Sequence, residues 1–237
     1  MTNPRIASRE EWRAARLELL EQEKAFMHHR DSISALRRDL PWVLVEEDYR
    51  FEAPGGEKSL GDLFNGKSQL IVQHFMLGED WEAGCPSCSF WADGFNGTTI
   101  HLENRDAAFV AVSNAPLVKI SAFKKRMGWQ FDWVSCHGSS FNHDYQASFT
   151  KQQMEEGTMD YNYRNSAFPS SEAPAISVFA KDWEGRVCHT YSCYSRGLDN
   201  MNVVYQYLDL LPKGRDEEHL SHAMAWVKRH DEYEKSV

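Results

Sequence analysis

Two cysteines three positions apart, Cys85 and Cys88, are the residues of this sequence best suited to covalent chemistry. They follow an apolar run that predicts a buried strand, and the pattern after them predicts a helix with Pro86 at the first helical position, where proline is favoured. Cys85 is then the N-cap residue, where the free N–H groups of Ser87 and Cys88 and the positive helix end favour a thiolate. We expect a lowered pKa for Cys85, whereas Cys88, one turn further on and more shielded, keeps its proton longer.

The spacing of this pair also permits a disulfide bond. Two helical residues three apart have Cβ atoms ~5–6 Å from each other, which exceeds the ~3.5–4.5 Å of a disulfide. Because Cys85 is a cap with non-helical dihedral angles, the gap closes without distorting the helix. A C-x-x-C pair at a strand-to-helix junction is typical of thiol redox chemistry.

Half of a zinc site is the alternative interpretation of the pair, and it needs two further ligands. The candidates elsewhere in the chain are Cys136, His137, His143, Cys188, His189 and Cys193. No second C-x-x-C exists, and on one strand a separation of five places Cys188 and Cys193 on opposite faces, ~16 Å apart. Taken singly, such cysteines are more often small buried hydrophobes. We therefore predict no metal and no cofactor, and a resolving role for Cys136 is a minor alternative.

Composition narrows the class of protein. The 237 residues, 42% of them hydrophobic, suffice for one large domain with a substantial core. A net charge of -9 with only short basic clusters excludes nucleic acid as the principal partner. No apolar stretch approaches the ~18 residues of a membrane span, and charged residues stand where a signal peptide has its apolar core. We expect a soluble, cytoplasmic protein without membrane contact, in which a close cysteine pair is catalytic or metal-binding.

The remaining elements are predicted from periodicity and capping. A capping box at Ser8 and Glu11 begins a helix over 9–30, a second short helix covers 32–39, and residues 1–40 form a helical extension. A hairpin follows in residues 42–60. From residue 68 the order is β-α-β-α-β-β-α, an α/β fold with a central mixed sheet flanked by helices. Its strands are expected in 69–77, 107–115, 175–182 and 186–193. Its helices are expected in 86–104, with an interruption at Asn96-Gly97, in 116–127 and in 198–208.

Two segments interrupt or follow this domain, which spans residues 41–218. Residues 137–173 are rich in Ser, Asn, Gly, Tyr and His without sustained periodicity, and so predict a loop-rich insertion before the last strand pair. The insertion is either a lid over a site or a surface addition without a chemical role. Residues 219–237 are expected to form a helical C-terminal tail.

The cysteine motif and its setting resemble the thioredoxin superfamily. More closely, the chain resembles a bacterial thioredoxin-like family of unknown function whose members are predicted dithiol-disulfide oxidoreductases. The likeness covers nearly the whole chain from the N-terminal helix to about residue 218. It is carried by the blocks "LPWVLVEEDYRFE", "DWEAGCPSCSFWADGFNG", "FVAVSNAPL", "KRMGWQFDWVS", "HTYSCYSRGLD" and "YQYLDLLPKGRDEE". The resemblance implies a thioredoxin-like fold and thiol redox activity.

The resemblance also suggests supporting residues. Thioredoxin-like proteins place a cis-proline beside the cysteines just before a strand, and Pro174 in "EAPAISVF" is the candidate, with an ordinary trans proline as the alternative. Thioredoxin has a Trp directly before the first Cys, whereas here Gly84 is adjacent and Trp81 lies four residues upstream. His74 replaces the buried acid of thioredoxin's central strand, and it is either a proton acceptor for Cys88 or a satisfied core residue.

Peroxiredoxins are the second family considered. They carry a Thr three residues before the reactive Cys and a Pro four residues before that, where this chain has Glu82 and Gly78. Peroxide reduction by that mechanism is disfavoured.

The sequence therefore predicts a thiol-disulfide oxidoreductase in which Cys85 attacks and Cys88 resolves. The alternatives are a thioredoxin-fold binding module with metal-binding or structural cysteines, or a thiol peroxidase using Cys85. The expected partner is a disulfide-bearing protein or a small-molecule thiol, and a homodimer through the N-terminal helices is a further expectation.

Overall fold

The computed structural model describes residues 4–165 and 168–234. The chain divides into two compact units, Met1–Pro41 and Trp42–Val237. Among the described residues, no helix combines the length and the apolar composition required to cross a bilayer.

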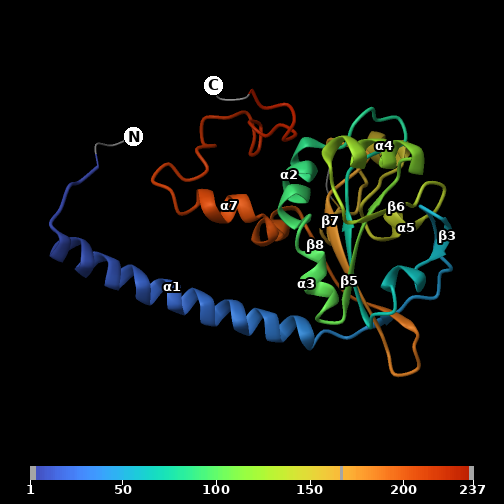
Figure 1. Cartoon of the computed structure of the whole chain (residues 1–237), viewed down its shortest axis with the longest axis horizontal. Helices are drawn as coiled ribbons and strands as arrows, with labels where there is room; N and C mark the ends of the chain where they lie inside the picture. The colour runs from blue at the N-terminus through green and yellow to red at the C-terminus, as the bar shows by residue number, and fades with distance from the viewer. Residues whose placement is uncertain (1–3, 166–167, 235–237) are drawn as a thin grey trace. The chain divides into compact units, whose positions relative to one another are not determined.

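The first unit is one helix, α1 (Arg9–Arg38) (Figure 1). The predicted capping box is present, because the Ser8 Oγ accepts from the Glu11 N–H at 3.2 Å and the Glu11 carboxylate accepts from the Ser8 N–H at 2.8 Å. The predicted break between residues 30 and 32 is absent, so the expectation of two helices is wrong. The Ser32 hydroxyl donates to the His28 carbonyl four residues earlier, which keeps this serine compatible with a continuous helix. None of the described residues of α1 is buried.

The second unit is built on an eight-stranded mixed sheet with the order β1-β8-β7-β4-β5-β6-β2-β3. Its strands are β1 (Val43–Leu44), β2 (Arg50–Ala53), β3 (Gly56–Ser59), β4 (Gln69–His74), β5 (Ala107–Ser113), β6 (Asp132–Ser135), β7 (Ala175–Lys181) and β8 (Val187–Tyr194). Its helices are α2 (Pro86–Phe95), α3 (Thr99–Glu103), α4 (Leu117–Met127), α5 (Phe141–Asp144), α6 (Lys151–Glu156) and α7 (Val203–Leu208), with 3-10 turns η1 (Asp62–Phe64) and η2 (Ser195–Met201).

The centre of this sheet has the thioredoxin-like arrangement, which confirms the predicted fold class. Strand β4 pairs in parallel with β5, and the chain connects the two strands through α2 and α3. Strand β4 also pairs antiparallel with β7, which forms a hairpin with β8. A fifth strand, β6, extends the sheet in parallel beyond β5. The sequence did not predict β6, because four residues are too few to show a period.

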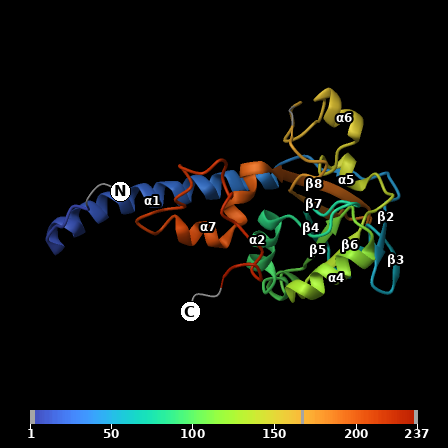
Figure 2. The ribbon, with the colours of Figure 1, turned by 90° about the horizontal axis from the view of Figure 1, so that it is seen from above.

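Two hydrophobic cores lie on the two faces of the sheet, because successive strand residues point to opposite sides. Figure 2 shows α2 and α4 on one side of the strands and α5 and α6 on the other. The core beneath α2 and α4 includes Phe75, Cys88, Ala92, Ala111, Ile120 and Phe123. The core on the opposite face includes Phe51, Phe64, Leu70, Val72, Val110, Val112 and Phe141.

The insertion 137–173 is more ordered than its sequence suggests over the residues that the structure describes. It contains α5 and α6, and the α6 N-terminus has its own capping box at Thr150 and Gln153. A small buried hydrophobic cluster packs the insertion against the sheet. Its members are Ala147, Phe149, Met159, Tyr161, Ala173, Ala175 and Tyr194.

The C-terminal tail is not helical between residues 219 and 234, contrary to expectation. Met224 has a left-handed φ of 67°, which a helix does not tolerate. The Glu217 carboxylate accepts hydrogen bonds from the Met224 N–H at 3.0 Å and from the Trp226 indole at 2.6 Å. These tertiary contacts fix the tail in an irregular conformation and override its helical composition.

Candidate active site

Cys85 lies directly before α2, at the end of the connection from β4, as the sequence predicts. It is the N-cap residue, with φ -51° and ψ 133°, and Pro86 follows at the first helical position. Its backbone is held at both ends: the Cys85 N–H donates to the Met76 carbonyl at 3.0 Å, and the Cys85 carbonyl accepts from the N–H and the hydroxyl of Ser89 at 3.0 and 2.9 Å. The backbone of Cys85 is therefore fixed before any ligand binds.

The two cysteines are close together and differ in exposure. Both are free thiols; Cys85 is half-buried, whereas Cys88 is only 2% exposed. Cys88 packs in the core beneath α2, next to Phe75 and Ala92. Cys85 is therefore the more exposed residue of the pair.

The environment separates the pKa values of the two thiols. A hydrogen bond from the Cys88 thiol is the main cause that lowers the pKa of Cys85 to about 6, against burial, which raises it. The N–H groups of Cys88 and Ser87 and the Ser87 hydroxyl lower it further, although the sulfur makes no capping hydrogen bond of standard geometry. Hydrogen bonding to Cys85, followed by burial, raises the pKa of Cys88 well above its usual value. The first proton therefore leaves Cys85.

Gly84, directly before the first cysteine, is required by packing. A Cβ atom there would lie 2.5 Å from a ring carbon of Phe75 and 2.6 Å from one of Phe123. The Trp that precedes the first cysteine in thioredoxin does not fit at this position. Trp81 instead packs half-buried against the same core as Cys85.

His74 does not serve Cys88, so the interpretation of this residue as a proton acceptor is wrong. Its ring nitrogens lie 2.9 Å from the Asn142 Oδ1 and 2.9 Å from the Ser177 Oγ. It points to the opposite face from Phe75, the neighbour that packs with Cys88. Burial lowers the pKa of His74 to about 4, so this residue is a neutral, satisfied core histidine.

Pro174 precedes β7 as expected, but its peptide bond is trans, since none of the described peptide bonds is cis. Its carbonyl accepts a hydrogen bond from the Tyr161 hydroxyl at 3.0 Å. The next residue, Ala175, pairs with the last residue of β4. Pro174 therefore lies at the same edge of the sheet as the dithiol, in the conformation of an ordinary proline before a strand.

Two aromatic residues of the insertion were not identified from the sequence. Phe168 packs half-buried both against the core that holds Cys85 and against the cluster of the insertion. Tyr161 is 5% exposed, and burial is the largest cause that raises the pKa of its hydroxyl; the charge that Cys88 would carry as a thiolate raises it further. Part of the insertion thus lines the dithiol site. No sequence signal indicated this, because the segment has no periodicity.

The other three cysteines, Cys136, Cys188 and Cys193, are all buried. The Cys136 thiol donates to the Ser113 carbonyl at 3.4 Å, and burial raises its pKa, which makes it a poor resolving thiol. In residues 4–165 and 168–234, no group of three or more His, Cys, Asp or Glu side chains is arranged to hold a metal ion.

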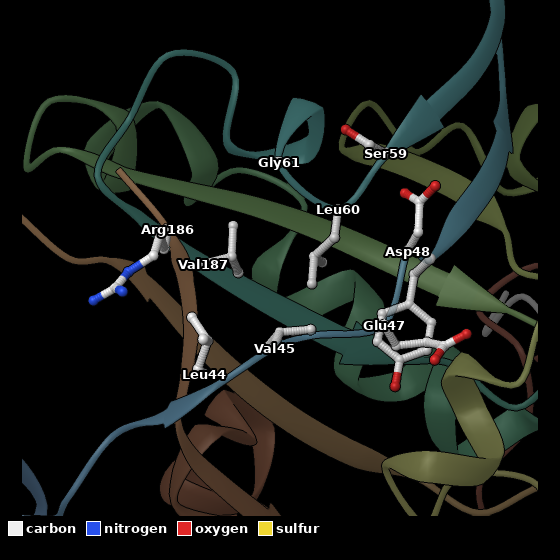
Figure 3. A pocket seen from close by; sticks show the side chains of 10 residues that line it. Leu44, Val45, Glu47, Asp48, Ser59, Leu60, Gly61, Arg186 and Val187 are labelled. Atoms are coloured by element: carbon white, nitrogen blue, oxygen red, sulfur yellow. The ribbon is translucent and has the colours of Figure 1, made fainter. Parts of the chain in front are cut away.

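A hollow of about 330 Å³ lies elsewhere on the domain, between the segment after β1, the turn after β3 and the start of β8 (Figure 3). Its Arg186 is paired with Asp182 at 2.7 Å and with Glu184 at 2.9 Å. Its lining contains no cysteine and no histidine. The dithiol is therefore the better candidate for chemistry.

Comparisons with known proteins give a family and distant structural likenesses. Residues 1–233 match the family described as "Bacterial protein of unknown function (DUF899)". No curated protein matches the sequence. Among solved structures, peroxidoxin BcpB from Mycobacterium tuberculosis is 13% identical with a TM-score of 0.47, over 71% of this chain and 96% of that one. Bacterioferritin comigratory protein from Xanthomonas campestris is 13% identical with a TM-score of 0.45, over 70% and 94%. These likenesses are too weak to indicate an activity.

Proposed function

Since the chain belongs to the DUF899 family of bacterial proteins of unknown function, we propose on the strength of its own residues that it is a thiol-disulfide oxidoreductase. Cys85 is the nucleophile and Cys88 the resolving thiol. The substrate is a disulfide carried by a protein or a small molecule.

The reaction proceeds in two exchanges. The Cys85 thiolate attacks one sulfur of the substrate disulfide, forms a mixed disulfide and releases the other substrate sulfur as a thiolate. Cys88 then loses its proton and attacks the Cys85 sulfur, so that the Cys85–Cys88 disulfide forms and the second substrate thiolate leaves. The protein loses two electrons and the substrate gains them. The return to the dithiol requires an external thiol reductant.

The opposite pKa shifts of the two cysteines carry this proposal. At neutral pH a pKa of about 6 makes Cys85 mostly thiolate, and Cys85 is the less buried residue of the pair. Cys88 is buried and keeps its proton, so it does not compete for the first attack. Once Cys85 enters a mixed disulfide, its negative charge is gone, and this removes one cause of the raised Cys88 pKa. The arrangement favours attack by Cys85 and then by Cys88.

Maleimide counting on protein cycled between a thiol reductant and a disulfide oxidant tests the proposal. We expect two thiols to become protected on oxidation in the wild type, with mass spectrometry assigning the link to Cys85 and Cys88. The Cys88→Ser variant should stop at a mixed disulfide on Cys85. In the Cys85→Ser variant, the Cys88 thiol should not become protected on oxidation. Cys188→Ser is the matched control, a buried cysteine outside the pair that should leave the count of protected thiols unchanged. If oxidation protects neither Cys85 nor Cys88, the mechanism is wrong.

A further inference from the structure

The C-terminal tail reaches the residue that precedes the nucleophile. The Arg229 guanidinium donates two hydrogen bonds to the Gly84 carbonyl, from Nε at 2.9 Å and from Nη2 at 2.7 Å. This carbonyl belongs to the same peptide unit as the Cys85 N–H, which is held from the other side by the Met76 carbonyl at 3.0 Å. Both polar groups of the peptide unit before Cys85, its carbonyl and its N–H, are therefore hydrogen-bonded.

Packing leaves this peptide unit little freedom. Gly84 is wedged between the rings of Phe75 and Phe123, where no side chain fits. The Arg229 guanidinium lies 5.9 Å from the centre of the Phe123 ring. Its side chain is only 17% exposed, so water competes weakly for its hydrogen bonds.

The tail itself is anchored by contacts of the three residues that follow Arg229. Glu232 pairs with Arg229 at 2.8 Å, and Arg126 of α4 binds Glu232 at 2.9 Å and Asp231 at 2.7 Å. The imidazole of His230 lies 2.7 Å from the Asp93 carboxylate of α2. These contacts dock the tail against both helices that cover the dithiol core, and they hold the guanidinium in place.

We propose that Arg229 is a positioning residue of the dithiol, which fixes through its guanidinium fork the peptide bond that precedes Cys85. The proposal rests on the proposed function. The donor fork does two things at this site. It restrains the backbone from which the nucleophile projects, and it places a guanidinium, itself paired with Glu232, on the carbonyl of the peptide bond before Cys85, where a positive charge favours the thiolate. The reduced protein is then stabilised relative to the disulfide form.

Titration of the thiolate by its ultraviolet absorbance in Arg229→Gln and Arg229→Lys tests this role. In Arg229→Gln we expect the pKa of Cys85 to rise by about 0.5 to 1 unit, with a shift of the Cys85–Cys88 couple to a more negative reduction potential. Arg229→Lys keeps the charge but loses the two-donor fork. Compared with Arg229→Gln, it should recover part of the shift in the Cys85 pKa and a smaller part of the loss in the rate of attack on a disulfide.

Arg215→Gln is the matched control. Arg215 is similarly buried and paired with two carboxylates, Asp199 and Asp209, but it has no contact with Gly84. It should lower the melting temperature without moving the Cys85 pKa. The proposal is overturned if Arg229→Gln, with a circular dichroism spectrum like that of the wild type, leaves the Cys85 pKa within error of the wild type, or if Arg215→Gln shifts it equally. The titration of Cys85 needs no substrate, so its outcome is independent of whether the wild type forms the disulfide.

Discussion

The hydroxyl of Tyr161 donates a hydrogen bond to the carbonyl of Pro174, 3.0 Å away. The same oxygen accepts one from the N–H of Ser195 at 3.0 Å. One side chain of the insertion therefore joins the residue before β7 to the residue after β8. The insertion is built into the end of the sheet that carries the dithiol, which favours a structural wall over a mobile lid.

Tyr161→Phe should lower the free energy of unfolding by about 1–2 kcal/mol, because it removes a buried hydroxyl with a donor and an acceptor partner. Urea unfolding at an unchanged m value measures the loss. Tyr163→Phe is the control, since its hydroxyl also donates to a backbone carbonyl, that of Ser192, but the residue is 67% exposed. Equal stability of the two variants would contradict a structural role for the Tyr161 hydroxyl.

Alkylation of the reduced protein should follow the ionisation of Cys85. The rate with iodoacetamide is expected to rise with pH around a midpoint of about 6, because the thiolate is the reacting form. Cys88→Ala removes the hydrogen bond that contributes most to this low value, so its midpoint should move upward. Cys88→Ser keeps a hydroxyl donor and should move less. A midpoint that is the same in the wild type and Cys88→Ala excludes the Cys88 thiol as the cause.

The sequence predicted the dithiol because its signals are local. A cysteine followed by a proline at a strand-to-helix junction defines the cap position and the order of ionisation, and the structure retains both features. The fold class followed from the alternation of strands and helices, which is also a short-range pattern. The strand β6 was missed because four residues show too short a pattern, and α5 and α6 were missed because residues 137–173 have no sustained periodicity.

The rest of the site depends on contacts between residues far apart in the chain. His74 is placed on the central strand by its sequence position, but its face of the sheet and its partners Asn142 and Ser177 depend on the register. Arg229 meets Gly84 across 145 positions. Neither contact produces a periodic pattern or a motif in the sequence. The contribution of the tail to the site could therefore not be predicted from the sequence.

Glu172 should make stability fall as the pH rises. It is 3% exposed, and burial raises its pKa from 4.5 to about 7, despite hydrogen bonds from Ser148 and Asn114. Because the folded pKa lies above the unfolded one, this group contributes stability that is present below pH 4.5 and lost as the pH rises through 7. The loss is about 3 kcal/mol if the full shift is expressed.

Glu172→Gln should abolish this decline, so that its unfolding free energy rises relative to that of the wild type between pH 5 and 8. Glu103→Gln, which alters an exposed carboxylate on α3, is the control and should keep the wild-type slope. A loss of stability on acidification should persist in both variants, because the pKa of His74 is lowered from 6.5 to about 4 in the folded protein, so the unfolded chain takes up this proton first as the pH falls from 6.5 to 4. Equal slopes in Glu172→Gln and the wild type would show that burial of this carboxylate does not govern the decline.

Gly84→Ala tests the packing that sets the approach to Cys85. The added methyl group meets the rings of Phe75 and Phe123 at 2.5 and 2.6 Å, which should cost about 1–3 kcal/mol in unfolding free energy. Gly97→Ala is the matched control, since its Cβ meets nothing within 4 Å. Phe123→Leu should relieve part of the clash, so a double-mutant cycle with Gly84→Ala is expected to give a favourable coupling. The crowding of Gly84 by these rings is refuted if Gly84→Ala is as stable as Gly97→Ala, or if the cycle shows no coupling with Phe123.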